Sequence, residues 1–221
     1  MGSISYTQHD LTPRILILVG ASTGGPQALA TVFAELALLP YTACLVVQHM
    51  PAGFTGNLAR RLDQFSKWCV KEAVDNEILQ SGTVYIAPGG QHLQIKSAGG
   101  RTRLMVHRDQ PVNGHQPSID ILFGSVARTW TGPVIGVLMT GMGKDGAKEL
   151  KTIRSIGGYT IAEAEETCVV YGMPKAAVQI GAADSITPLP EIANAIQNAW
   201  HTFAAGSKLA SPADCLSSGL E

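Results

Sequence analysis

The chain has 221 residues, of which 45% are hydrophobic and only 15% charged, and it contains 24 glycines and 12 prolines. This composition is too apolar for a disordered protein and too rich in glycine for an ordinary helical bundle. The formal net charge is −1, so no basic field exists to attract nucleic acid or an anionic membrane. We therefore expect one large domain with a buried parallel sheet, which neither binds nucleic acid nor inserts into a membrane.

Other features narrow the class further. A long run without charge, residues 15–34, is broken by glycine, serine, threonine and proline, so it predicts no membrane span. The start of the sequence lacks the basic-then-apolar layout of a secretory signal. The four cysteines are widely spaced and form no CxxC pair, which argues against a zinc site or a redox motif. Together these features predict a cytoplasmic protein that needs no metal and no cofactor.

The first half of the chain alternates apolar runs with helical patterns. Residues 1–13 are polar and are expected to form a flexible leader before a single domain at 14–204. Buried strands are expected at 14–19, 43–48 and 84–87, because these short apolar runs end at turn residues. Helices are expected at 28–38, with Pro26 in the first turn, and at about 54–65.

The second half continues the alternation after one interruption: polar and apolar residues alternate over 91–106 on both sides of Gly99-Gly100, which predicts an antiparallel hairpin. Further strands are expected at 133–139 and 158–162. Helices are expected at 118–129 with Ser118 as the cap, from about 145, after Pro174 and at 190–203, followed by a disordered tail at 205–221. The fold class predicted is therefore α/β: a doubly wound, mostly parallel sheet flanked by helices, with a small hairpin.

Three polar residues follow different predicted strands. Ser22 lies in Gly20–Pro26, which fits G-x-S-x-G between a strand and a helix, an arrangement that exposes a serine hydroxyl. His49 follows the second strand, and Asp145 follows the strand at 133–139. Each residue also has a structural interpretation: Ser22 or Thr23 could cap a helix, His49 could be a loop histidine bonded to backbone, and Asp145 could cap the next helix.

The three residues are more informative together. The carboxyl ends of parallel strands meet at one edge of a sheet, where ligands bind, so Ser22, His49 and Asp145 should converge. A serine hydroxyl needs a base to take its proton, and that base needs an acid to orient it. The order Ser, His, Asp along the chain differs from the order in the α/β-hydrolases.

Longer motifs resemble the catalytic domain of the bacterial chemotaxis protein-glutamate methylesterase family, CheB, from about residue 15 to residue 196. The matching stretches are Val19–Pro26, Val46–Asp63, Val84–Leu93, Pro117–Ala127, Gly136–Leu150 and Val169–Ala177. The resemblance implies that Ser22 is the nucleophile, His49 the base and Asp145 the orienting acid. It also implies that the backbone N–H of Met142 lines the oxyanion hole, and the place of Thr23 at the helix start suggests a second donor.

The resemblance implies a substrate and partners as well. Family members hydrolyse glutamate methyl esters on the cytoplasmic helices of chemoreceptors, which sets chemotactic adaptation, and members can also deamidate receptor glutamines. They usually carry an N-terminal receiver domain, for which the 13 residues before the first strand leave no room, so a separate response-regulator protein is a candidate partner. Members often have Gln-Asp where this sequence has Glu163 and Ala164, a local departure outside the three catalytic positions.

Two other hypotheses stay open. The chain could be a non-catalytic module of the same fold that only docks on receptors, although all three candidate catalytic residues are present. It could also be an NAD(P)-dependent short-chain dehydrogenase, since Tyr171 and Lys175 match Y-x-x-x-K. Pro174 argues against the second hypothesis, because it would interrupt the helix that has to place both side chains on one face.

Overall fold

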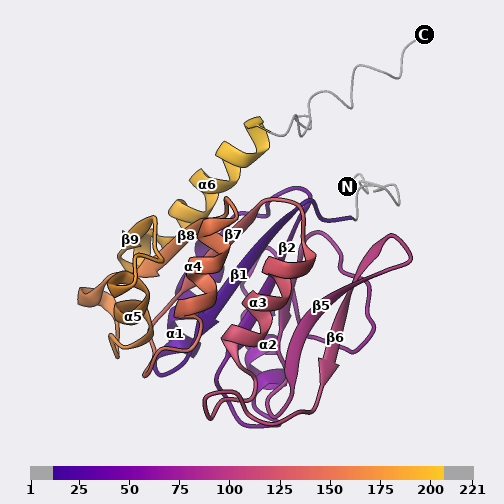
Figure 1. Cartoon of the computed structure of the whole chain (residues 1–221), viewed down its shortest axis with the longest axis horizontal. Coiled ribbons are helices and arrows are strands. Elements are labelled where there is room, and N and C mark those ends of the chain that lie inside the picture. Colours follow the sequence, from indigo (N-terminus) through magenta and orange to yellow (C-terminus); the bar gives the residue numbers. More distant parts are fainter. Residues whose placement is uncertain (1–11, 207–221) are drawn as a thin grey trace.

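A computed structural model describes residues 12–206, and the parts of the predicted leader and tail at 1–11 and 207–221 lie outside this range (Figure 1). Seven parallel strands form one sheet in the order β3-β4-β2-β1-β7-β8-β9. Their bounds are β1 Ile15–Ala21, β2 Thr42–Gln48, β3 Cys69–Glu72, β4 Thr83–Ile86, β7 Val134–Leu138, β8 Tyr159–Glu163 and β9 Ser185–Thr187.

The antiparallel hairpin stands apart from this sheet. It consists of β5 (His92–Ala98) and β6 (Arg101–His107), with His92 paired opposite His107. The predicted α/β class, with a mostly parallel sheet and a hairpin near 91–106, is therefore confirmed.

The central strand β1 shows why the sheet is covered on both faces. All seven of its residues are buried. Because successive side chains of a strand point to opposite faces, Ile15, Ile17 and Val19 pack into one hydrophobic cluster, while Leu16 and Leu18 pack into the other. A strand buried on both sides reads as a continuous apolar run, which is how the sequence revealed it.

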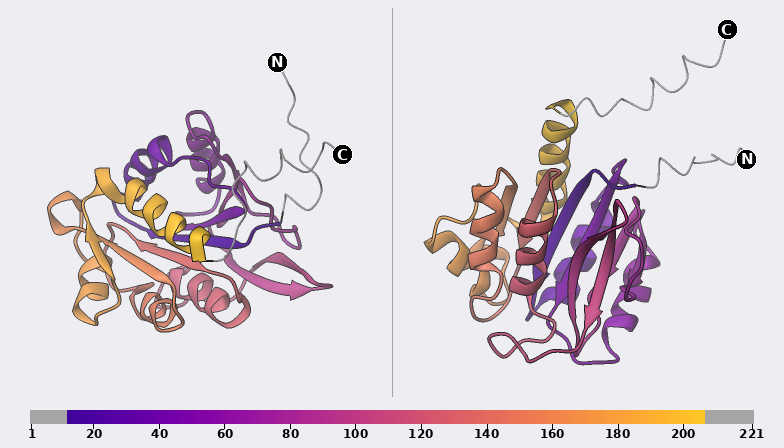
Figure 2. Two further views of the ribbon diagram at one scale, coloured as in Figure 1. Left: turned by 90° about the horizontal axis from the view of Figure 1, so that it is seen from above. Right: turned by 45° about the vertical axis from the view of Figure 1, so that its right-hand side comes forward.

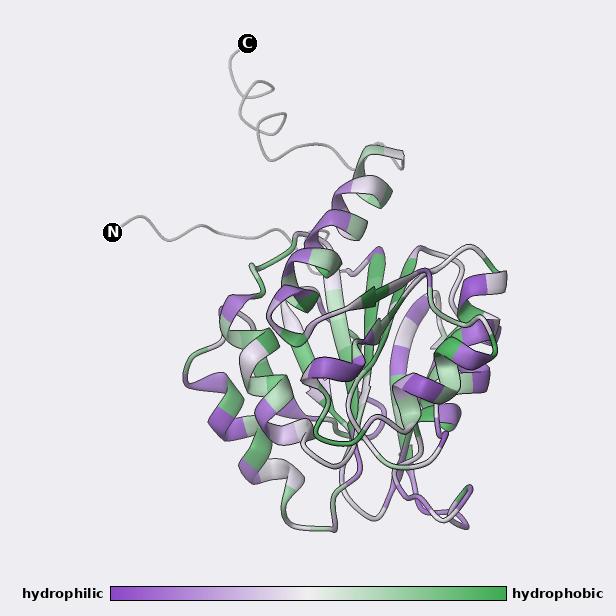
Figure 3. Cartoon of the chain, turned by 90° about the vertical axis from the view of Figure 1, so that its left-hand side faces the viewer, coloured by the Kyte–Doolittle hydropathy of each residue, from purple (hydrophilic) through white to green (hydrophobic). Residues whose placement is uncertain are grey.

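Helices cover the two faces of the sheet, three on each side (Figure 2). One face carries α1, α2 and α6, and the other carries α3, α4 and α5 together with the hairpin. Their bounds are α1 Gly25–Glu35, α2 Thr55–Asp63, α3 Ile119–Thr129, α4 Ala147–Ser155, α5 Met173–Gln179 and α6 Ile192–Gly206, and short 3₁₀ turns lie at Glu165–Thr167 (η1) and Leu189–Glu191. Hydrophobic strands run between helices whose outer surfaces are largely hydrophilic (Figure 3).

Two strands were not predicted from the sequence. Both β3 and β9 lie at the edges of the sheet, are only three or four residues long and are partly exposed. Edge strands of this kind lack a long apolar run, so their pattern does not stand out from a loop. Among residues 12–206, no helix is long and apolar enough to cross a membrane.

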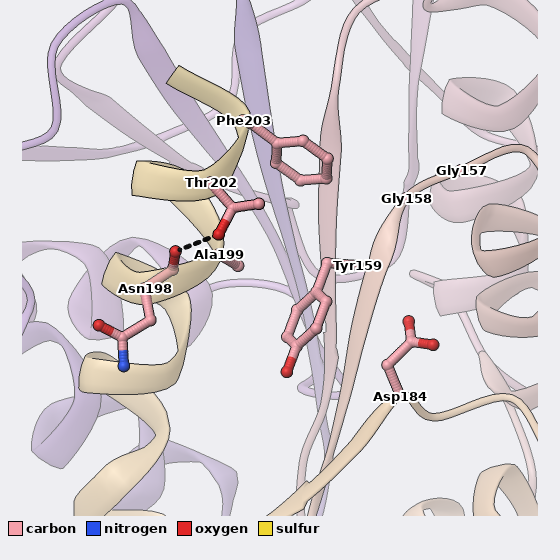
Figure 4. Close-up of a pocket in the computed structure, with 8 residues that line it drawn as sticks. All are labelled: Gly157, Gly158, Tyr159, Asp184, Asn198, Ala199, Thr202 and Phe203. Carbon is pink, nitrogen blue, oxygen red and sulfur yellow. Dashed lines mark hydrogen bonds between the residues drawn. The ribbon is translucent and has the colours of Figure 1, made fainter. Parts of the chain in front are cut away.

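The structure also contains a cavity of about 380 Å³ at the amino-terminal end of β8, beside α6 (Figure 4). Tyr159, Asp184 and Phe203 are among its lining residues, and Thr202 donates a hydrogen bond to the carbonyl of Asn198 at its rim. This cavity lies at the opposite end of the strands from the turns that carry Ser22, His49 and Asp145. It is therefore separate from the predicted active site.

Candidate active site

The turn that carries Ser22 joins the ends of three neighbouring strands. Ser22 follows β1, and its backbone N–H donates to the carbonyl of Thr140, which comes after β7, at 3.0 Å. On the other side, Gln48 at the end of β2 donates through Nε2 to the carbonyl of Ser22 at 2.8 Å and to that of His49 at 3.2 Å. Gln48 is buried, and its role was not predicted. The signal that could have found it is a polar residue that ends an otherwise apolar strand.

The hydroxyl of Ser22 is not used to cap helix α1. Gly24 is the N-cap residue, with a φ of 83° that favours glycine, and it makes no side-chain cap bond. The turn is closed by backbone instead, since the Gly25 N–H donates to the Ser22 carbonyl at 2.8 Å. Within residues 12–206 the Ser22 hydroxyl forms no hydrogen bond. The structural alternative, in which Ser22 or Thr23 merely caps the helix, is therefore wrong.

His49 is placed next to Ser22 by the register of the sheet. Ala21 of β1 pairs with Gln48 of β2, and the His49 N–H donates to the Ala21 carbonyl at 3.1 Å. Its ring nitrogen Nε2 lies 2.8 Å from Oδ2 of Asp145, while Nδ1 is buried and, among the described residues, has no hydrogen-bond partner. The ring is thus bonded to a carboxylate and not to backbone.

The hydrogen bond expected between Ser22 and His49 is not formed in this structure. Its two groups, the Ser22 hydroxyl and His49 Nδ1, are nevertheless both without partners in the part of the chain that the structure describes. Catalytic hydrogen bonds are often long or misaligned in a free enzyme and tighten when substrate binds. Nδ1 of the ring is therefore unpaired, and Nε2 is bonded to Asp145.

Asp145 is almost fully buried and accepts four hydrogen bonds. Besides His49, the donors are the Ser118 hydroxyl at 2.9 Å and the backbone N–H groups of Ile119 at 2.7 Å and Asp120 at 3.1 Å. These groups form the start of α3. Asp145 therefore caps α3 and not α4, the helix that follows it in the chain, whose N-cap residue is Gly146. Ser118 is the N-cap residue of α3, as predicted, but its hydroxyl donates to Asp145 and makes no bond to the backbone of the helix.

These donors determine the charge of the site. Burial alone would raise the pKa of Asp145, but the hydrogen bonds from His49 and from the start of α3 outweigh burial and hold that pKa below its usual range. The positive end of the α3 dipole also favours a carboxylate there. Asp120 accepts the Gly146 N–H at 2.9 Å, and burial together with the neighbouring Asp145 raises its pKa to about 6.

A second histidine covers the ring of His49. The two imidazoles of His49 and His115 are stacked, with centroids 3.9 Å apart and planes within 10° of parallel. Burial and the nearby charge of His49 lower the pKa of His115. The sequence did not predict this contact, because nothing local to the loop of His115 indicates that it folds back over a residue 66 positions earlier.

Two backbone N–H groups near Ser22 are free to bind an oxyanion. Among residues 12–206, neither the Thr23 N–H nor the Met142 N–H donates a hydrogen bond, and the Met142 side chain is 73% exposed. The preceding residue, Gly141, brings this loop close: a Cβ added there would lie 2.6 Å from Cβ of Ser22, so a side chain does not fit. Within the described residues, no group of three acidic, histidine or cysteine side chains could hold a metal ion.

Comparison with known proteins identifies the family. Residues 17–196 match the model of the CheB methylesterase family. The chain belongs to this family. It is 45% identical over 185 residues to a protein-glutamate methylesterase/protein-glutamine glutaminase of Archaeoglobus fulgidus, and 48% identical over 184 residues to one of Geobacillus kaustophilus. These alignments cover 84% and 83% of the chain but 53% of each relative, so the chain spans about half the length of the curated relatives it matches.

A solved structure supports the same assignment. The chain is similar to the CheB methylesterase catalytic domain of Thermotoga maritima, with a TM-score of 0.79 and 38% sequence identity. The match covers 86% of this chain and 99% of that domain. The sheet and its flanking helices are thus those of the family's catalytic domain, and the resemblance recognised in the sequence is confirmed.

Proposed function

We propose that this chain hydrolyses glutamate methyl esters on the cytoplasmic helices of chemoreceptors, with Ser22 as nucleophile, His49 as base and Asp145 as orienting acid. The observation that carries the proposal is the 2.8 Å bond between His49 Nε2 and Asp145, which leaves Nδ1 without a hydrogen-bond partner among the described residues, at the edge of the sheet where Ser22 lies. The names of the family relatives support the reaction. A receptor substrate of this kind places the reaction in the cytoplasm.

The first half of the reaction forms an acyl-enzyme. Nδ1 of His49 takes the hydroxyl proton of Ser22 while Oγ attacks the ester carbonyl carbon, and the carbonyl oxygen becomes an oxyanion. The N–H groups of Thr23 and Met142 stabilise that oxyanion. The tetrahedral intermediate collapses when the bond to the methoxy group breaks, and His49 gives its proton to the departing oxygen, which leaves as methanol.

The second half regenerates the serine. A water molecule gives a proton to His49 and attacks the acyl carbon, and the bond to Ser22 Oγ breaks as that oxygen regains a proton. Asp145 remains ionised throughout and offsets the positive charge of the imidazolium. A receptor glutamine would follow the same steps, with ammonia in place of methanol, so one site can serve both reactions.

The surface beside the site has room for a receptor segment. A cleft of about 690 Å³ opens next to the acid, and Asn113, Asp120 and Lys144 are among its lining residues. Charged and amide side chains share the cleft with apolar ones such as Ile121 and Ile180, and most of its exposed lining is apolar, so it suits an amphipathic helix better than a purely polar one.

Methanol release from methylated receptor tests the proposal. The wild type should release methanol, and the Ser22→Ala variant should do so at least about 10³-fold more slowly, because the acyl-enzyme cannot form. A wild type that binds receptor but releases no methanol above background would favour the non-catalytic docking module. A Ser22→Ala variant as fast as the wild type would show that another residue is the nucleophile.

A further inference from the structure

Thr140 connects the turn that carries Ser22 to the loop that follows β7. Its carbonyl accepts the Ser22 N–H at 3.0 Å, and its hydroxyl donates to the Thr23 carbonyl at 2.9 Å. The same hydroxyl accepts the N–H of Val170 at 3.0 Å. A displacement of Thr140 would therefore move the backbone of Ser22 and Thr23. It would also move Gly141 and Met142, which follow Thr140 directly in the chain.

The backbone N–H of Thr140 is held by a buried carboxylate. Glu163, the last residue of β8, is fully buried, and its Oε2 accepts the Thr140 N–H at 2.8 Å. Its Oε1 accepts the Thr167 hydroxyl at 3.1 Å. None of the ion pairs formed within residues 12–206 includes Glu163. The donors at these short distances, the Thr140 amide and the Thr167 hydroxyl, are both neutral groups.

The titratable groups near Glu163 do not neutralise it. The turn η1 and the residue after it contribute Glu165, Glu166 and Cys168, and the Cys168 thiol lies 3.9 Å from the Glu163 carbonyl. The end of β7 contributes only the Thr140 amide. Burial accordingly raises the pKa of Glu163. Nothing around this side chain requires a negative charge, and what its neighbours use is a hydrogen-bond acceptor.

We propose that Glu163 is a positioning residue for the acyl-transfer site: its side-chain oxygen fixes the Thr140 amide and so sets the distance between Ser22 and the oxyanion donors of the following loop. This inference rests on the proposed esterase function. The proposed role requires a hydrogen-bond acceptor and not a negative charge, so a neutral acceptor of the same length at position 163 should serve equally well.

Three substitutions of Glu163 separate the effect of the hydrogen-bond acceptor from the effect of the negative charge. In Glu163→Gln, Oε1 can accept the Thr140 N–H, and Nε2 can donate to the Thr167 hydroxyl, which also accepts the N–H of Leu189. In Glu163→Met the volume is similar but the acceptor is gone. In Glu163→Asp the charge is kept but the oxygens are withdrawn by one methylene group.

Steady-state methanol release by the three variants tests the inference. Glu163→Met and Glu163→Asp should lower kcat about tenfold or more with KM within about twofold, since an oxyanion site out of place weakens the transition state and not substrate binding. Glu163→Gln should keep kcat within about twofold of the wild type. An active Asp variant with a defective Gln variant would overturn the inference, as would a folded Met variant with wild-type kcat. The Asp and Gln variants decide the question even if the Met variant does not fold.

Amide hydrogen exchange provides a readout that does not depend on catalysis. Peptides that cover 20–24 and 139–143 should exchange faster in the Asp and Met variants than in the wild type, and as slowly as the wild type in the Gln variant. Unchanged exchange in all variants would contradict the positioning role. If the exchange pattern is found but the wild type releases no methanol, the proposed esterase function fails while the positioning of Ser22 by Glu163 stands.

Discussion

Asp145 and Glu163 are two buried carboxylates at the same edge of the sheet: Asp145 comes after β7, and Glu163 is the last residue of the neighbouring strand β8. Asp145 accepts four hydrogen bonds, one of them from His49, and lies at the positive end of a helix. Glu163 accepts two, both from neutral groups. The pKa of Asp145 is held below its usual range, whereas that of Glu163 is raised.

The difference shows that burial alone does not decide whether a carboxylate carries charge. Burial disfavours the ionised form of both groups, and only the donors around Asp145 compensate for it. A site that must balance an imidazolium needs the first kind of carboxylate. A site that must only hold a backbone N–H in place can use the second kind.

The largest expected effect comes from removing the charge of Asp145. The Asp145 carboxylate accepts four hydrogen bonds, so in Asp145→Asn the amide NH₂ would face hydrogen-bond donors. The asparagine would also no longer hold His49 in the required tautomer. We expect kcat for methanol release to fall by about 10⁴-fold. The measurement is the initial rate of methanol release, with circular dichroism to verify that the variant is folded.

The matched control is the same chemical change on the neighbouring strand. Glu163→Gln should leave kcat within about twofold of the wild type, because its neighbours use an acceptor and not a charge. Equal losses of kcat in Asp145→Asn and Glu163→Gln would mean that the negative charge matters equally at the two carboxylates.

A smaller effect is expected from removing one donor to Asp145. Ser118→Ala deletes the 2.9 Å hydrogen bond from the hydroxyl, and a hydrogen bond to a charged group contributes about 1.5 kcal/mol to the free energy of unfolding. Because the low pKa of Asp145 stabilises the fold at neutral pH and this contribution is lost on acidification, the variant should begin to lose stability at a higher pH than the wild type. Urea denaturation between pH 3 and pH 7 measures both effects, and identical curves would contradict the account.

The smallest effect is a change in the pH dependence of stability in Glu163→Gln. A raised pKa means that the fold favours the protonated form, so the contribution of Glu163 is fully present below about pH 4.3, the usual value in the unfolded chain, and is lost as the pH rises through the folded pKa. Relative to the wild type, the Gln variant should therefore gain stability from pH 4 upward. Thermal unfolding at a series of pH values measures this gain, and a constant difference would indicate an unshifted pKa.

Much of the fold could be predicted because its central strands are buried on both faces. The runs that became β1, β2 and β7 are continuous and apolar, and they end at turn residues. The order of strands then follows from ordinary connections in α/β proteins, and it brings Ser22, His49 and Asp145 to one edge. These positions could be identified because strand ends are local features of a sequence.

The surroundings of these residues could not be predicted, since they depend on contacts between distant segments. The donors to Asp145 come from the start of α3, about 26 residues earlier, and His115 reaches His49 from a loop with no local signal. The acceptor for Thr140 is Glu163, on the next strand along the sheet. A pattern in one segment can place a side chain at an edge, but it does not show which groups will surround that side chain.

The central claim is that Ser22 is a nucleophile activated through His49 and the charged Asp145. Labelling with a serine-directed fluorophosphonate, followed by peptide mapping, tests it most directly, because the reagent reports the activated hydroxyl without any receptor. We predict labelling at Ser22, at nearly the same rate in the wild type and in Glu163→Gln, and a rate reduced by orders of magnitude in Asp145→Asn. Labelling at another residue, or an unchanged rate in Asp145→Asn, would contradict the account.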